Sequence, residues 1–100
     1  MAFEVKRFNL EKMGIGRDGK VMATPSKATI EALLRARLQL ASRKWNLPSG
    51  TEQNIVFNIT GQGVMDVSAV GETITGLLKS NFINYDHVYV QDGSTLTQIR

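Results

Sequence analysis

The alternation of apolar and polar residues at the start of the chain predicts a β-hairpin. Residues 3–10 alternate, but the pattern changes phase in the middle of the segment, so this strand is expected to bulge or to end early. Asp18 and Gly19 lie within the glycine-rich residues 13–20, and an Asp-Gly pair is typical of a tight turn. Residues 20–23 are then expected to form the short return strand.

Apolar residues three to four positions apart predict a long helix in the next segment. Thr24 followed by Pro25 is a typical helix start, and Ser26 is the alternative cap. Asn46 and Pro48 are expected to end the helix. The stripe expected to be buried consists of Ile30, Leu33, Leu34, Leu38, Ala41 and Trp45.

The middle of the chain predicts a strand, a glycine turn and a second helix. Residues 54–60 alternate strictly and are expected to form the central strand. The turn at residues 61–63 leads to Asp66, which is expected to cap a helix that ends near Asn81. Gly71 lies beside the apolar stripe of this helix and would let it approach the sheet closely. The stripe consists of Val67, Val70, Ile74, Leu77, Leu78 and Phe82.

A second hairpin is predicted at the end of the chain, with strands at residues 87–91 and 95–99 and a turn at residues 92–94. The predicted order is therefore ββαβαββ. This order indicates one α+β domain over residues 1–100, with two helices packed on one face of a four- to five-stranded mixed sheet. The strands at either end of the second helix are expected to form a right-handed crossover if they pair in parallel.

The composition of the chain argues against a membrane-spanning, a secreted or a metal-binding protein. The chain has 100 residues, of which 42% are hydrophobic and 21% are charged, which is typical of a soluble globular protein. It has no apolar run long enough for a membrane span, and its charged start does not look like a signal peptide, so we expect a cytoplasmic protein, or a virion protein if it is of phage origin. Cysteine is absent and histidine occurs once, so no metal and no cofactor are expected.

The turn at residues 61–63 is a candidate phosphate-binding loop. Gly61 and Gly63 lie between a strand and a helix, where a dinucleotide-binding loop holds a pyrophosphate. Asp66 occupies the place of the third glycine, however, and its carboxylate would repel phosphate. A strand-to-helix turn capped by aspartate is therefore the favoured interpretation, and a small phosphate ligand is the alternative.

The sequence does not predict an enzyme. Acid–base catalysis needs titratable groups that share a pocket, and Asp86 and His87 are the only adjacent carboxylate and imidazole. Neighbouring residues of a strand point to opposite faces, so this pair is not expected to act together. The sequence also lacks the serine motif of the α/β-hydrolases, G-x-S-x-G.

Uneven charge suggests a nucleic-acid-binding accessory protein as one alternative. The formal net charge is +3, and most of the twelve Lys and Arg residues lie in the first half of the chain. If the first hairpin and the first helix project their cations to one side, they would follow a phosphate backbone. An ordinary solvated basic face is the other interpretation. The candidate nucleic-acid patch consists of Lys12, Arg17, Lys20, Arg35, Arg37, Arg43 and Lys44.

Protein–protein assembly is the function that the sequence favours. From His87 to Ile99 the only formally charged residue is Asp92, and a weakly charged hairpin invites strand addition from a neighbour. We therefore expect protein partners, in a homo-oligomer or a larger assembly. The alternative is that the same apolar residues complete the core. The candidate assembly edge consists of Val88, Tyr89, Val90, Leu96 and Ile99.

The segment NIVFNITGQGVMDVSAVGETITGLLKSNF, residues 54–82, resembles the C-terminal ends of bacteriophage tail tape-measure proteins. In that pattern an alternating strand leads through a glycine turn into an aspartate-capped helix. The resemblance covers 29 of the 100 residues, and the chain lacks the long coiled-coil body of that family. It implies a small structural or accessory protein of a phage particle, and it assigns no functional residues.

Overall fold

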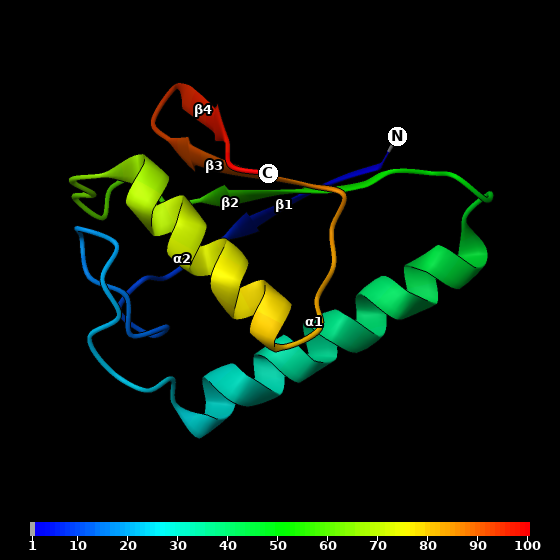
Figure 1. The fold of residues 1–100 in the computed structure, drawn as a ribbon, viewed down its shortest axis with the longest axis horizontal. Coiled ribbons are helices and arrows are strands. Elements are labelled where there is room, and N and C mark those ends of the chain that lie inside the picture. The colour runs from blue at the N-terminus through cyan, green and yellow to red at the C-terminus, as the bar shows by residue number, and fades with distance from the viewer. Residues whose placement is uncertain (1) are drawn as a thin grey trace.

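Two helices and four strands follow one another in the order βαβαββ (Figure 1). A computed structural model describes residues 2–100. The predicted fold class is confirmed: the chain is a small α+β domain with two helices and a mixed sheet. The elements are β1 (Ala2–Arg7), α1 (Lys27–Asn46), β2 (Gln53–Asn58), α2 (Val67–Ser80), β3 (His87–Asp92) and β4 (Thr95–Gln98).

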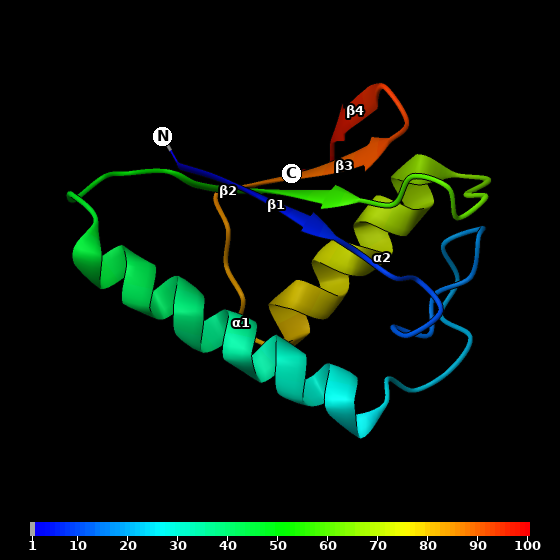
Figure 2. The same cartoon turned by 180° about the vertical axis from the view of Figure 1, so that it is seen from behind.

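The sheet has the strand order β1-β2-β3-β4. β2 pairs in parallel with both β1 and β3, and β4 pairs antiparallel with β3. The two crossovers therefore move across the sheet in the same direction, and both helices lie on one face of it (Figures 1 and 2). No helix covers the opposite face within residues 2–100, and we call that face the open face.

The core lies between the sheet and the helices. Ile55 is paired with Val88 and Phe57 with Val90, and all four side chains point toward the helices with at most 4% of their surface exposed. The intervening positions point to the open face, where the rings of Phe3 and Tyr89 lie 6.0 Å apart. One side of the sheet is therefore fully packed, and the other carries apolar side chains with no layer above them.

The predicted start of α2 is confirmed. The Asp66 side chain caps the helix by accepting a hydrogen bond of 3.0 Å from the Ala69 amide. Gly71 is buried, and a Cβ added there would collide with the Ile99 side chain, so the close approach expected at this glycine is also present. The expectation that Phe82 is buried is wrong. It follows the end of the helix with a φ of 59° and leaves 71% of its surface exposed.

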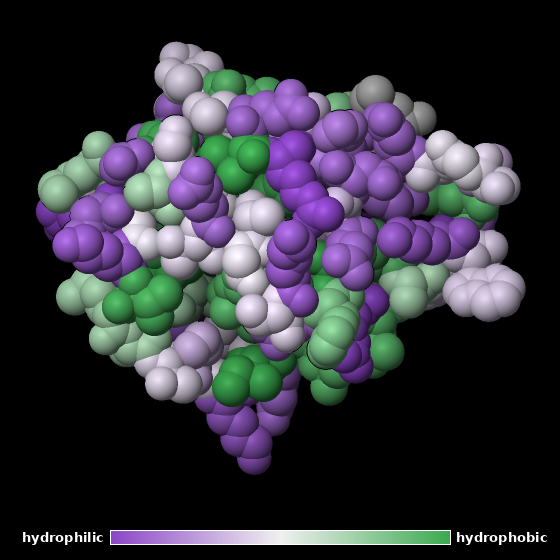
Figure 3. All heavy atoms as spheres, viewed as in Figure 1, coloured by the Kyte–Doolittle hydropathy of each residue, from purple (hydrophilic) through white to green (hydrophobic). Residues whose placement is uncertain are grey.

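The predicted buried stripe of α1 is wrong except for Leu33, which is 8% exposed. The helix starts after Ser26, the alternative cap, whose hydroxyl accepts from the Thr29 amide at 3.2 Å. Its buried residues are Thr29, Leu33 and Leu40. Apolar residues surround more than half of this helix, and it is rotated so that a different row faces the core. The exposed apolar residues of this helix are Ile30, Leu34, Leu38 and Trp45. Figure 3 shows apolar (green) surface in the lower part of the view, where α1 lies in Figure 1.

The predicted first hairpin does not form. β1 ends at Arg7, and residues 20–23 make only an isolated bridge between Ile15 and Val21. Leu10 and Ile15 are instead buried in the core, and the Leu10 amide donates to the Gln62 side chain at 2.8 Å. Residues 8–26 therefore form a loop across the end of the sheet, because tertiary burial of these side chains overrides the local turn signal.

Candidate functional site

The outer side of β1 carries main-chain groups without partners. The Phe8 amide donates to the Asn58 carbonyl at 3.0 Å and continues the ladder between β1 and β2. Residues alternate along a strand, so the N–H and C=O groups of Phe3, Val5 and Arg7 point away from β2. No hydrogen bond reaches these groups from the rest of residues 2–100. We call them the β1 edge, and Figure 2 shows no helix crossing in front of it.

Apolar side chains adjoin the β1 edge on the open face. Phe3 and Val5 leave 57% and 65% of their surfaces exposed. Val56 on β2 and Tyr89 on β3 continue the same apolar row across the sheet. An unpaired edge beside exposed apolar side chains is a template for another strand, since it offers both hydrogen bonds and a surface to bury.

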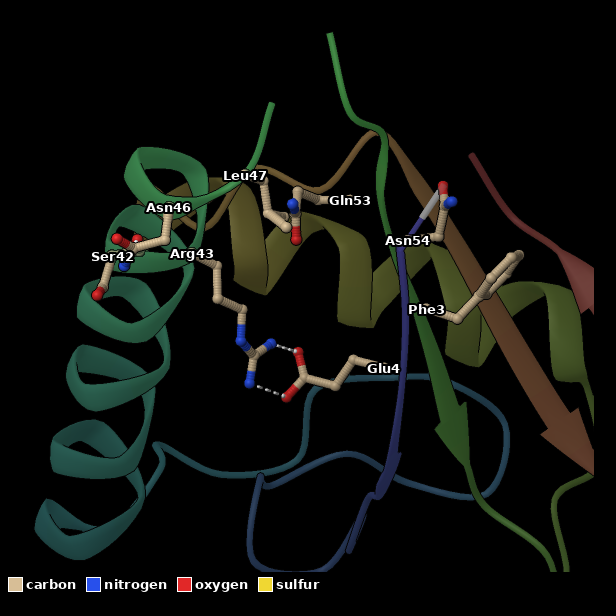
Figure 4. Close-up of a pocket in the computed structure, with 8 residues that line it drawn as sticks. All are labelled: Phe3, Glu4, Ser42, Arg43, Asn46, Leu47, Gln53 and Asn54. Carbon is tan, nitrogen blue, oxygen red and sulfur yellow. Dashed lines mark hydrogen bonds and ion pairs between the residues drawn. The ribbon is translucent and has the colours of Figure 1, made fainter. Parts of the chain in front are cut away.

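Charged side chains occupy the opposite, helix-facing side of β1. The two terminal guanidinium nitrogens of Arg43 donate to the Glu4 carboxylate (Figure 4). The Tyr85 hydroxyl donates to the same carboxylate at 2.7 Å, and the Lys6 ammonium lies 3.4 Å from it. This cluster ties α1 to the strand whose outer edge is free.

The surroundings of Glu4 shift its titration. Burial raises the pKa of the Glu4 carboxyl, but the hydrogen bonds from Arg43 and Tyr85 and the charge of Lys6 together bring the pKa below its usual value. The hydrogen bond to Glu4 raises the pKa of the Arg43 guanidinium. Burial first, and then the bond to Glu4, raises the pKa of the Tyr85 hydroxyl. The cluster is therefore held with Glu4 ionised and Tyr85 protonated at neutral pH.

A cavity of about 340 Å³ lies beside this cluster, between the end of α1 and the start of β1 and β2 (Figure 4). Arg43 and Asn46 line it from α1, and Gln53 points toward α1 from β2. The side-chain Nε2 of Gln53 and both polar atoms of the Asn54 side chain are buried without a hydrogen-bond partner among residues 2–100. The start of β2 therefore still has hydrogen-bonding capacity, at Gln53 on the helix-facing side and at Asn54 opposite Phe3.

Acid is expected to weaken the tie between α1 and β1. The Glu4 pKa is lower in the folded chain than in the unfolded one, so its contribution to stability is present above the unfolded pKa and is lost as the pH falls through the folded pKa. Glu4→Gln should therefore lower the melting temperature at pH 7, and the difference from the wild type should shrink as the pH falls below about 4. Thermal unfolding from pH 7 to pH 3 measures this, and a difference that does not change with pH would contradict it.

The five residues of the candidate assembly edge do not lie on one surface in the structure. Val88 and Val90 are 1% and 0% exposed beneath the helices, and Ile99 packs against Gly71, so these three complete the core. Tyr89 is half-buried on the open face, and Leu96 on β4 is 56% exposed. The sequence did not single out Phe3 and Val5 for assembly. The sequence shows that they alternate with polar residues within AFEVKR, but it does not show that this strand lies at the edge of the sheet.

The candidate nucleic-acid residues lie on several surfaces. Arg43 binds Glu4, and the Lys44 ammonium donates to the Asn84 carbonyl at 3.3 Å. Arg35 and Arg37 are two positions apart on α1, which turns them about 200° away from each other. Lys12, Arg17 and Lys20 belong to the loop of residues 8–26. Nucleic-acid binding stays a prediction.

The glycine turn before Asp66 and the Asp86–His87 pair form hydrogen bonds or close contacts with other parts of the chain. Asp66 caps α2, and the Met65 amide beside it donates to the Arg17 carbonyl at 2.9 Å. The Asp86 carboxylate accepts from the main-chain N–H of Gln53 at 2.6 Å, whereas the His87 ring lies 3.5 Å from Glu52. Asp86 and His87 thus have separate partners.

Two further observations concern the class of protein. Within residues 2–100, neither helix combines the length and the apolar content that crossing a bilayer requires. No protein-family model, no curated protein and no solved structure matches the chain.

Proposed function

We propose that this chain is a non-enzymatic assembly protein whose copies associate by strand addition at a sheet edge. The observation that carries the proposal is the β1 edge, where unpaired main-chain groups lie beside the exposed side chains of Phe3 and Val5. Strand addition satisfies such groups and removes the apolar side chains from water in the same step. Fully burying one side chain of this size contributes about 1.5–3 kcal/mol.

The β1 edge is better suited to this role than the opposite edge of the sheet. β1 has six residues and β4 has four, so β1 offers the longer ladder. Leu96 is the only large apolar residue of β4, whereas Phe3 and Val5 form a continuous surface with Val56 and Tyr89. Charges on the open face of β1 are confined to Arg7 at its end.

The biological setting is proposed from the sequence. The resemblance of residues 54–82 to tape-measure C-terminal segments supports a structural or accessory role in a phage particle. Repeated copies of one small subunit suit such a particle, since closed symmetric assemblies are built from identical interfaces. Binding of nucleic acid by the basic residues would be a separate activity and is measured by the salt dependence of DNA and RNA binding.

Proline at the β1 edge is expected to abolish self-association. The Val5 N–H points away from β2, so Val5→Pro removes a donor from the β1 edge and leaves the ladder to β2 intact. The wild type should form a species heavier than the monomer as its concentration rises to about 1 mM, a range that detects even weak association. Val5→Pro should stay monomeric.

Light scattering and sedimentation at increasing concentration measure this difference. Val5→Thr is the matched control, because it keeps the N–H and a β-branched side chain. Circular dichroism should show the same secondary structure in all three proteins. A wild type that remains a monomer over the whole concentration range would rule the proposal out.

A further inference from the structure

We infer that the occupant of the β1 edge is a second copy of the same strand, antiparallel, with Val5 on a two-fold axis. This inference rests on the proposed function and adds the partner, the strand and the register. A two-fold axis perpendicular to the sheet would join two four-stranded sheets into one of eight strands. It would also keep both pairs of helices on the same face.

Hydrogen bonding restricts the register. In an antiparallel pair, residues whose N–H and C=O groups face the partner lie opposite residues of the same kind. Phe3, Val5 and Arg7 are these residues, so each must face another of the three. This condition allows a two-fold axis at a residue of β1 but not between two residues.

Charge then selects one axis. An axis at Glu4 would place the two Glu4 side chains opposite each other, and an axis at Lys6 would do the same for the two lysines; both arrangements oppose like charges. An axis at Phe3 or Arg7 would overlap only the ends of the strands. An axis at Val5 places each Glu4 opposite the partner's Lys6 and overlaps residues 3–7 of both copies.

The same axis matches the side chains on the open face. Val5 meets the partner's Val5, and each Phe3 lies opposite the partner's Arg7, whose guanidinium can pack on the ring. Phe3 and Val5 are the exposed apolar residues of β1, so this register places both in the interface. Complementarity therefore holds on both faces of the strand.

The Glu4 cluster adjoins the interface. Glu4 already binds Arg43 and Tyr85 and lies 3.4 Å from Lys6 of its own chain, which fixes the carboxylate on the helix-facing side of β1. The partner's Lys6 would reach this carboxylate across the β1 edge, on the same helix-facing side of the sheet, next to the cavity lined by Arg43 and Gln53. A held carboxylate loses little side-chain freedom when it pairs with a new cation.

A disulfide across the axis tests the register directly. The chain has no cysteine, so Val5→Cys introduces a single thiol. Directly opposed, hydrogen-bonded residues of an antiparallel pair have Cα atoms about 5.5 Å apart, which a disulfide can bridge. Under mild oxidation Val5→Cys should form a covalent dimer at least about tenfold faster than Leu96→Cys on β4 or Val21→Cys in the loop, because only Val5 faces its own copy.

The outcomes separate this inference from the proposed function. A wild type that is oligomeric by light scattering, with Leu96→Cys cross-linking faster than Val5→Cys, would place the interface at β4 and overturn the β1 register while leaving the proposed function standing. Equal, slow cross-linking of all three variants in an oligomeric protein would also overturn the register. A strictly monomeric wild type would overturn both.

Charge reversal tests the paired side chains independently. Lys6→Glu would place like charges opposite each other at both ends of the interface, and dimer affinity should fall at least about tenfold, as expected for opposed like charges on paired strands. Lys79→Glu on α2 is the matched control, since it makes the same change in charge away from β1. Equal dimer affinities of these two variants would contradict the inference.

Mixing two charge-reversal variants should restore the dimer that each variant alone cannot form. A Glu4→Lys chain and a Lys6→Glu chain are each repulsive toward their own copy but complementary to each other in this register. An equimolar mixture should restore the dimer. Circular dichroism of each variant alone shows whether the fold persists without the bond between Glu4 and Arg43. If Glu4→Lys does not fold, the Val5→Cys and Lys6→Glu measurements decide the inference.

Discussion

Replacing Leu40 by alanine is expected to lower the free energy of unfolding by about 3 kcal/mol, whereas replacing Leu38 should lower it by less than about 1 kcal/mol. Leu40 is 4% exposed and belongs to the core, while Leu38 leaves 58% of its surface exposed. The two substitutions remove the same atoms from the same helix, two positions apart. Their difference therefore isolates the burial of one side of α1.

Urea unfolding of the two variants measures this difference, and each is its partner's control. The helix propensity of the new residue is the same at both sites, so it cancels between them. Equal losses of stability would mean that α1 is rotated differently about its axis. A larger loss for Leu38→Ala would restore the stripe expected from the sequence.

Gly19→Ala should also cost about 3 kcal/mol, because two effects add at this position. Gly19 has a φ of 85°, a conformation that residues with a Cβ rarely adopt. A Cβ there would lie 2.6 Å from the Ala69 carbonyl carbon and 2.7 Å from the Val70 nitrogen. These are main-chain atoms of α2, so the loop and the helix would have to separate.

Gly93→Ala is the matched control for Gly19→Ala. Gly93 has a φ of 62°, but nothing lies within 4 Å of an added Cβ. Only the cost of the left-handed backbone conformation remains there, about 1 kcal/mol. Thermal and urea unfolding should rank the two variants accordingly, and similar losses would show that the loop of residues 8–26 does not pack on α2 as described.

The sequence predicts α2 and the C-terminal hairpin correctly, because the local residue pattern of each segment fits only one structure. Asp66 and the spacing of Val70, Ile74 and Leu78 give α2 a cap and a single apolar row, and the structure confirms both. The C-terminal hairpin follows from a regular alternation around a glycine turn. In these segments propensity, pattern and tertiary burial agree.

The sequence does not predict features that depend on contacts between residues far apart in the chain. α1 has apolar residues on two sides, and which of them is buried depends on its contacts with the sheet and α2. The loop of residues 8–26 has the turn signals of a hairpin, but Leu10 and Ile15 are buried in the core instead. The β1 edge could not be predicted for the same reason, since sequence patterns do not give the order of strands in a sheet.

The parallel pairing of β1 with β2 has a consequence for how the chain folds. Ala2 pairs with Gln53, so about fifty residues must close into a loop before the first of these hydrogen bonds forms. The hairpin of β3 and β4 requires the closure of only a few residues, and it can form far earlier. Docking of the N-terminal segment is therefore expected to be the slow step of folding, and until it occurs β2 remains open to strands of other molecules.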